Sequence, residues 1–98
     1  VVLVTNYLFR PKLAALFDLV VEGGYLVYET FAVGNADFGR PKNPDFLLHE
    51  GELVEALPAG FNIIDTFHGF VSDPQPAVIQ RLAARRVNPS YQTSKSIV

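Results

Sequence analysis

The chain has 98 residues, of which 49% are hydrophobic and 18% charged, and 8 basic and 10 acidic side chains give a net charge of −2. This balance excludes intrinsic disorder, which requires few apolar residues and a large net charge, and the lack of a basic field argues against nucleic-acid binding. The absence of cysteine excludes disulfides and thiolate metal sites, and the apolar runs are too short for a membrane span, so a cytoplasmic protein is expected.

The chain opens on an unbroken aliphatic run from Val1 to Val4 that is rich in β-branched residues. Such a short run predicts a strand buried on both faces, as in a parallel sheet. Because no turn or cap precedes this strand, we expect the natural domain to continue upstream of it.

A helix of about three turns is predicted to begin near Pro11, whose fixed φ and missing N–H suit the first helical position. Its apolar side chains recur at helical spacing, at Leu13, Leu16, Phe17, Val20 and Val21. Gly23 and Gly24 are expected to end the helix. The aromatic and β-branched segment Tyr25–Phe31 predicts a second strand. Residues 1–31 therefore read as a β-α-β unit with a right-handed crossover.

Residues 33–44 are rich in glycine, proline and asparagine and predict a loop. A loop of about a dozen residues is longer than a compact domain usually needs, and such loops often act as lids over a site. A short helix is predicted from Glu50 to Leu57, and Pro58 and Gly60 are expected to end it.

The last part of the chain predicts a strand over Phe61–Val71, with Gly69 as a candidate β-bulge, followed by a turn at residues 73–76. Residues 77–87 fit two interpretations. Their apolar spacing favours a helix, whereas the β-branched start directly after a turn favours the second strand of a hairpin. Residues 88–98 show no apolar period and are expected to form a disordered tail.

Three stretches of this sequence resemble class I S-adenosylmethionine-dependent methyltransferases: TNYLFRP, VEGGYLVYETF and GNADFGRPKNPDFLLHEGEL. The likeness runs from Val1 to Arg86 and is to the C-terminal half of those enzymes, in particular to the tellurite-resistance and ubiquinone-biosynthesis-like branch. It implies an α/β fold, with residues 1–87 forming part of a Rossmann-like sheet in the order β-α-β-α-β-β. The last two strands would form an antiparallel hairpin, the final strand lying beside Tyr25–Phe31. The resemblance thus favours a strand for residues 77–86.

The resemblance implies methyl transfer from S-adenosylmethionine to a small-molecule acceptor. In the family, a glycine-rich loop after the first strand and an acidic residue after the second hold the cofactor, and no glycine-rich loop follows a strand here. The chain is therefore expected to be a methyltransferase fragment. The alternative is a non-catalytic α/β half-domain that acts through self-association or partner binding at its exposed first strand.

Candidate site residues lie where the predicted parallel strands end, because ligands of open α/β sheets bind at the carboxyl ends of the strands. The resemblance implies that Thr5, Asn6 and Tyr7 border the cofactor. The alternative is a strand-to-helix loop whose polar side chains satisfy backbone donors. Glu29 ends the next strand and is a candidate to orient a substrate or act as a base, or else to pair with a loop arginine.

The long loop supplies further candidates for substrate binding. They are Asn35, Arg40 and Asn43. The guanidinium of Arg40 could hold an anionic substrate through its fork of donors. The alternative is a loop braced by prolines that docks Phe38 and Phe46 onto the sheet.

No metal site is predicted. The two histidines, His49 and His68, do not match a short ligand spacing. No serine or cysteine lies beside a histidine to suggest nucleophilic catalysis.

Overall fold

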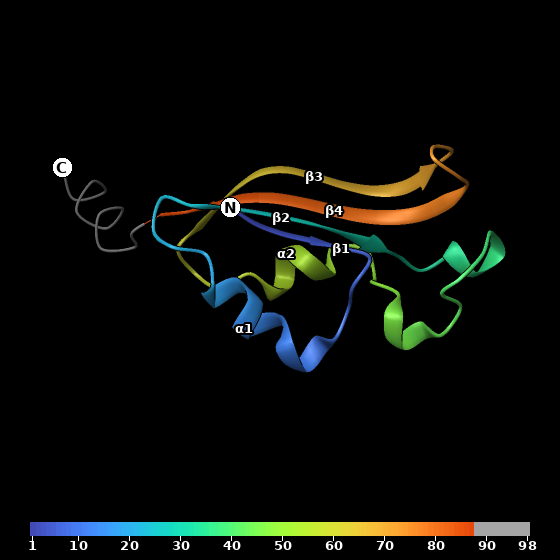
Figure 1. Ribbon diagram of the computed structural model, residues 1–98, viewed down its shortest axis with the longest axis horizontal. Coiled ribbons are helices and arrows are strands. Elements are labelled where there is room, and N and C mark those ends of the chain that lie inside the picture. The colour runs from blue at the N-terminus through green and yellow to red at the C-terminus, as the bar shows by residue number, and fades with distance from the viewer. Residues whose placement is uncertain (88–98) are drawn as a thin grey trace.

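Four strands form one mixed sheet in the order β1-β2-β4-β3 in the computed structural model, which describes residues 1–87 (Figure 1). β1 (Val2–Thr5) runs parallel to β2 (Tyr25–Phe31). β4 (Ala77–Arg86) runs antiparallel to both of its neighbours, β2 and β3 (Phe61–Val71). The predicted α/β class and the terminal antiparallel hairpin are confirmed, whereas the predicted disordered tail lies outside the described residues.

β4 resolves the ambiguity of residues 77–87 in favour of a strand. It lies between two strands and buries alternate side chains, among them Leu82 and Ala84. A strand paired on both edges satisfies every backbone donor and acceptor through the ladder, which outweighs the helical spacing of the apolar residues.

Both α-helices lie on one side of the sheet (Figure 1). We call the face that packs on them the covered face and the other the open face. In β1, Val4 points to the covered face and is buried, whereas Leu3 points to the open face and is 65% exposed. The prediction that Val1 to Val4 is buried on both faces is therefore wrong.

The first helix is shorter than predicted. α1 spans Leu13–Asp18 and directly follows a 3-10 turn at Arg10–Lys12. The β-branched residues Val20 and Val21 come after its end, and such residues are poor helix formers. Gly23, with φ of +78°, forms the turn into β2 rather than the end of the helix.

The second helix is also shorter than the predicted residues 50–57. α2 spans Glu52–Ala56. Gly51 precedes it with φ of +76°, a left-handed conformation that glycine adopts without steric cost. Leu57 is already extended, as expected for a residue that precedes a proline.

The hairpin of β3 and β4 contains one irregularity, but not at the candidate position. Gly69 pairs with Ile79 in regular register, and the register shifts between Ile63 and Asp65. The predicted bulge at Gly69 is therefore wrong, and Ile64 is the extra residue.

The core lies between the covered face and the two helices. Its largest fully buried apolar side chains are Phe17, Leu26, Tyr28, Leu48, Leu53 and Leu82. Within residues 1–87, no buried side-chain nitrogen or oxygen lacks a hydrogen-bond partner. This core fixes the strand ends and the loops that follow them.

Candidate functional site

A cleft of about 560 Å³ opens where the two parallel strands end. Its lining residues are Asn6, Tyr7, Leu8, Phe9, Thr30, Phe31, Pro41 and Phe46. They come from the segment after β1, the end of β2 and the long loop, which in the structure spans residues 32–51 between β2 and α2. The volume suits a small organic molecule, and the walls are mostly aromatic and aliphatic, as in most small-molecule sites.

Asn6 turns the chain out of the sheet at the end of β1. Its φ is +54°, and it is the only non-glycine residue between residues 1 and 87 with a positive φ. Asparagine tolerates this left-handed conformation better than most residues. Its backbone N–H still donates to the Glu29 carbonyl at 2.9 Å. The Asn6 side chain makes no hydrogen bond within the described chain and lines the cleft, so its amide is free to bind a ligand.

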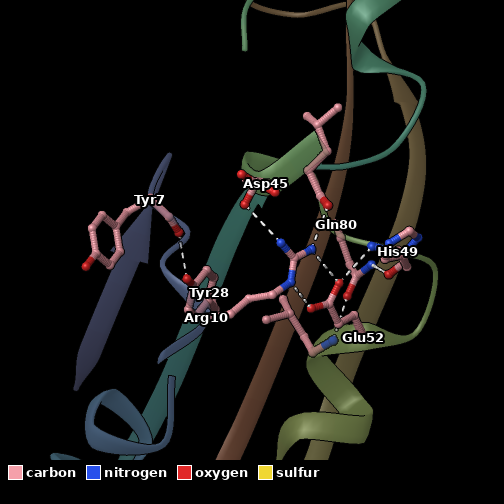
Figure 2. A network of polar contacts seen from close by, with 9 residues as sticks. Tyr7, Arg10, Tyr28, Asp45, His49, Glu52 and Gln80 are labelled. Carbon is pink, nitrogen blue, oxygen red and sulfur yellow. Dashed lines mark hydrogen bonds and ion pairs between the residues drawn. The ribbon is translucent and has the colours of Figure 1, made fainter. Parts of the chain in front are cut away.

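Tyr28 holds in place the segment after β1, which forms one wall of the cleft. Its hydroxyl donates to the Tyr7 carbonyl at 2.6 Å, while the ring of Tyr7 points away from this contact (Figure 2). Tyr28 is fully buried in the core, and this burial raises the pKa of its hydroxyl to about 12. The hydroxyl therefore stays protonated and remains a donor at neutral pH.

Arg10 joins the segment after β1 to the long loop and to α2 (Figure 2). Its Nε and Nη2 donate to Glu52 at 2.6 and 2.9 Å. Nη1 donates to the Asp45 carbonyl at 2.9 Å, and Nη2 also donates to the Leu47 carbonyl at 2.8 Å. The hydrogen bond to Glu52 raises the pKa of Arg10, and the same bond lowers the pKa of Glu52. Both groups are therefore charged at neutral pH.

Gln80 anchors α2 to the sheet from β4. Its Oε1 accepts from the Leu53 N–H at 2.9 Å, and its Nε2 donates to the His49 carbonyl at 2.6 Å (Figure 2). The same nitrogen lies 3.1 Å from Nδ1 of His68. The buried amide thus holds the beginning of α2, and with it Glu52, in a fixed position.

Of the predicted cofactor-binding residues, Asn6 and Tyr7 line the cleft and Thr5 does not. Glu29 points to the open face, where its Oε1 accepts from Arg81 Nε at 2.8 Å. Its partner is thus a strand arginine rather than the loop arginine that the alternative interpretation named. Glu29 is not among the residues that line the cleft.

The three loop candidates are near one another, since Arg40 shares one hollow with Asn35 and another with Asn43, but they differ in burial and hydrogen bonding. Asn35 is buried, with its Oδ1 accepting from the Val78 N–H at 3.1 Å and its Nδ2 donating to the Pro41 carbonyl at 3.4 Å. Arg40 and Asn43 line a neighbouring hollow of about 470 Å³ that shares Pro41 with the cleft. Arg40 makes no hydrogen bond or ion pair within the described chain.

Sequence reasoning missed the Arg10–Glu52 pair and the contact of Tyr28. It named Phe46 only as a residue that docks on the sheet, yet Phe46 lines the cleft and is 47% exposed. Phe38 does dock, with its ring centroid 5.1 Å from that of Phe70 on β3. No local sequence signal distinguishes Phe46, which lines the cleft, from Phe38, which docks.

No protein-family model, curated protein or solved structure matches this chain. Within residues 1–87, no group of three or more histidine, cysteine, aspartate or glutamate side chains is placed to hold a metal ion. Over the same range, no helix has the length and apolar character needed to cross a membrane.

Proposed function

We propose that this chain is the acceptor-binding part of an S-adenosylmethionine-dependent methyltransferase. The observation that carries the proposal is the strand order, in which antiparallel β4 lies between β2 and β3. The sequence resemblance implies this insertion, and it is not the order of a simple meander. A cytoplasmic enzyme is part of the same proposal, since the sequence holds no cysteine.

The cleft lies where the proposal needs it, at the carboxyl ends of the parallel strands. The free amide of Asn6 and the backbone of Tyr7 fit one edge of a cofactor site. No carboxylate lines the cleft to bind ribose hydroxyls, so the described residues supply only that edge. When bound, the cofactor supplies an electrophilic methyl group on a sulfonium sulfur.

The role of this chain in the proposed reaction is to orient the acceptor and to exclude water. Phe9, Phe31 and Phe46 offer apolar surface against which an acceptor would be desolvated. Arg40 and Asn43 lie beside the mouth of the cleft, where they would bind a polar group of the same acceptor. Holding the acceptor in line with the methyl group is the main requirement of this chemistry, and it demands no further catalytic side chain.

Equilibrium dialysis of the 98-residue chain with radiolabelled S-adenosylmethionine tests the proposal. We expect saturable binding that Asn6→Gly weakens, because this change removes the amide and keeps the left-handed backbone accessible. Thr5→Ala is the matched control, since Thr5 lies next to the cleft without lining it. Absence of saturable binding at millimolar cofactor would contradict the proposal, because the cleft would then not border a cofactor site.

A second proposal, self-association without catalysis, is favoured by the position of β1. Within residues 1–87 this strand pairs only with β2; Leu3 in it is 65% exposed, and Val1, which directly precedes it, is 89% exposed. An uncovered apolar edge strand is a template for pairing with another chain. Sedimentation velocity tests the idea: we expect dimers that Leu3→Lys dissociates, and a purely monomeric profile at high protein concentration would contradict it.

A further inference from the structure

The side chain of Phe46 lies where three hollows meet. It lines the cleft of about 560 Å³ and the hollow of about 470 Å³ beside Arg40. It also lines a third hollow of about 370 Å³, which Arg10 and Asp45 help to form. Phe46 is the one residue that lines all three hollows, so its side chain forms part of the wall between them.

Side-chain packing holds this ring only in part. Phe46 is half exposed, and none of the aromatic ring pairs within residues 1–87 includes it. Its position also depends on its backbone, which forms a 3-10 turn over Pro44–Phe46. Asn43 begins this turn: its carbonyl accepts from the Phe46 N–H at 3.0 Å and its Oδ1 accepts from the Asp45 N–H at 2.9 Å.

Arg10 binds the backbone on both sides of Phe46. Its guanidinium donates to the carbonyls of Asp45 and Leu47, the residues immediately before and after Phe46. Glu52 accepts two further hydrogen bonds from the same planar group and so fixes its orientation. We call this set of four hydrogen bonds the Arg10 clamp.

The Arg10 clamp also sets the spacing of the two cleft walls. Arg10 directly follows Phe9, which lines the cleft from the segment after β1, while Phe46 lines it from the long loop. One side chain thus ties both walls together. The guanidinium can serve two carbonyls and a carboxylate at once because it has five donors in one plane.

We propose that Phe46 limits the size of the ligand that the cleft accepts, and that Arg10 and Glu52 are the positioning residues that hold it there. The inference rests on the proposed function in one respect, that this cleft is the ligand site. It adds the selecting residue and the device that positions it. Loss of the Arg10 clamp is expected to release the Phe46 turn and to join the cleft with its neighbouring hollows.

The chain contains no tryptophan, so Phe46→Trp introduces a single fluorescent reporter at the cleft wall. In that background we expect Arg10→Met to raise the acrylamide quenching constant at least about two-fold, because the released turn exposes the indole. Arg10→Lys should give an intermediate value, since an ammonium group keeps the charge but has only three donors for the four hydrogen bonds of the clamp and lacks the planar fork. Arg81→Met is the matched control, because Arg81 forms the other arginine–glutamate pair and contacts no residue of the Phe46 turn.

Ligand size is tested by calorimetric titration of the 98-residue chain with phenol, 1-naphthol and 1-pyrenol as neutral aromatic probes. Phe46→Ala and Arg10→Met should each raise the ratio of the affinity for 1-pyrenol to the affinity for phenol by about ten-fold. Arg81→Met should leave this ratio unchanged. Equal quenching in the Arg10→Met and Arg81→Met proteins would overturn the positioning role.

An unchanged probe preference in Phe46→Ala, or failure of every probe to bind the unaltered chain, would overturn the size-selecting role. Failure of the proposed function looks different. Probe binding and its response to Arg10→Met would persist while cofactor binding by dialysis is absent.

Discussion

One arginine–glutamate pair, Arg10 with Glu52, lies on the side of the sheet that the helices cover, which we call the covered side. The other, Arg81 with Glu29, lies on the open face, and the two arginines differ in their further contacts. On the covered side, Arg10 binds Glu52 and two backbone carbonyls. On the open face, Arg81 binds Glu29 at 2.8 Å and lies 5.5 Å from the centre of the Phe67 ring. Both of these partners are side chains. The first pair joins segments that no strand ladder holds together, whereas the second joins neighbouring strands that the ladder already pairs.

From this difference we expect an ion pair in this protein to matter mainly through the segments that its arginine holds together. Exposed pairs typically contribute about 0–1 kcal/mol, because solvent screens them and side-chain entropy opposes them. A charged donor that also satisfies carbonyls of an otherwise loose turn contributes more. We therefore expect substitutions on the covered side to affect both stability and ligand binding, and those on the open face to affect neither strongly.

The largest contrast between the faces is expected for leucine truncations. Leu26→Ala removes a fully buried side chain from the covered face and should lower the free energy of unfolding by about 2–5 kcal/mol. Leu3→Ala, on the open face, should change it by no more than about 0.5 kcal/mol. Urea unfolding followed by circular dichroism measures both. A loss for Leu3→Ala that grows with protein concentration would instead support the second proposal, in which another copy of the chain covers Leu3.

Arg10→Met is expected to give the next largest effect, a loss of about 2 kcal/mol in the free energy of unfolding. The pH dependence sharpens this prediction. The folded pKa of Glu52 lies below its ordinary value of 4.5, so its contribution is fully present above that pH and is lost as the pH falls through the lower folded pKa. Urea titrations over this acid range should show a steeper loss in the unaltered chain than in Arg10→Met. Parallel curves would contradict the role of the pair.

Tyr28→Phe should cost about 1 kcal/mol, because it leaves the Tyr7 carbonyl without its donor. The folded pKa of Tyr28 is raised from 10.0 to about 12, so the stability it contributes is present below pH 10 and is lost as the pH rises through 12. Alkaline unfolding of the unaltered chain should therefore be steeper with pH than that of Tyr28→Phe. Identical alkaline profiles would mean that Tyr28 ionises as readily in the folded protein as in the unfolded chain.

Much of the fold could be predicted from local sequence patterns. The strand Tyr25–Phe31 and the strand Phe61–Val71 agree with the structure in their bounds, since β-branched and aromatic runs between turn residues specify strands well. Residues 77–86 could not be assigned by periodicity, and the family resemblance supplied the correct strand. The predicted end of α1 is wrong because a glycine with a left-handed backbone can end a helix or form a turn. Here Gly23 forms the turn before β2, and α1 ends earlier, at Asp18.

The candidate site was predictable only where it follows a strand. Asn6 and Tyr7 were found because ligands bind at the ends of parallel strands. The Arg10–Glu52 pair was not found, because its two members are 42 residues apart and nothing local links them. Glu29 lies near the end of β2, but side chains alternate between faces along a strand, so it points away from the cleft.

The smallest effect is expected for Arg81→Met, which should change the free energy of unfolding by less than about 1 kcal/mol. The side chains of Arg81 and Glu29 are 39% and 36% exposed, so water can solvate each charge once the pair is broken. Methionine preserves much of the contact with the Phe67 ring, since its thioether packs well on aromatic edges. A double-mutant cycle with Glu29→Gln isolates the pair, and we expect a coupling energy near zero that does not vary with salt. A coupling as large as that between Arg10 and Glu52 would remove the distinction between the two faces. An arginine–glutamate pair would then stabilise the fold equally well whether or not its arginine also binds backbone carbonyls.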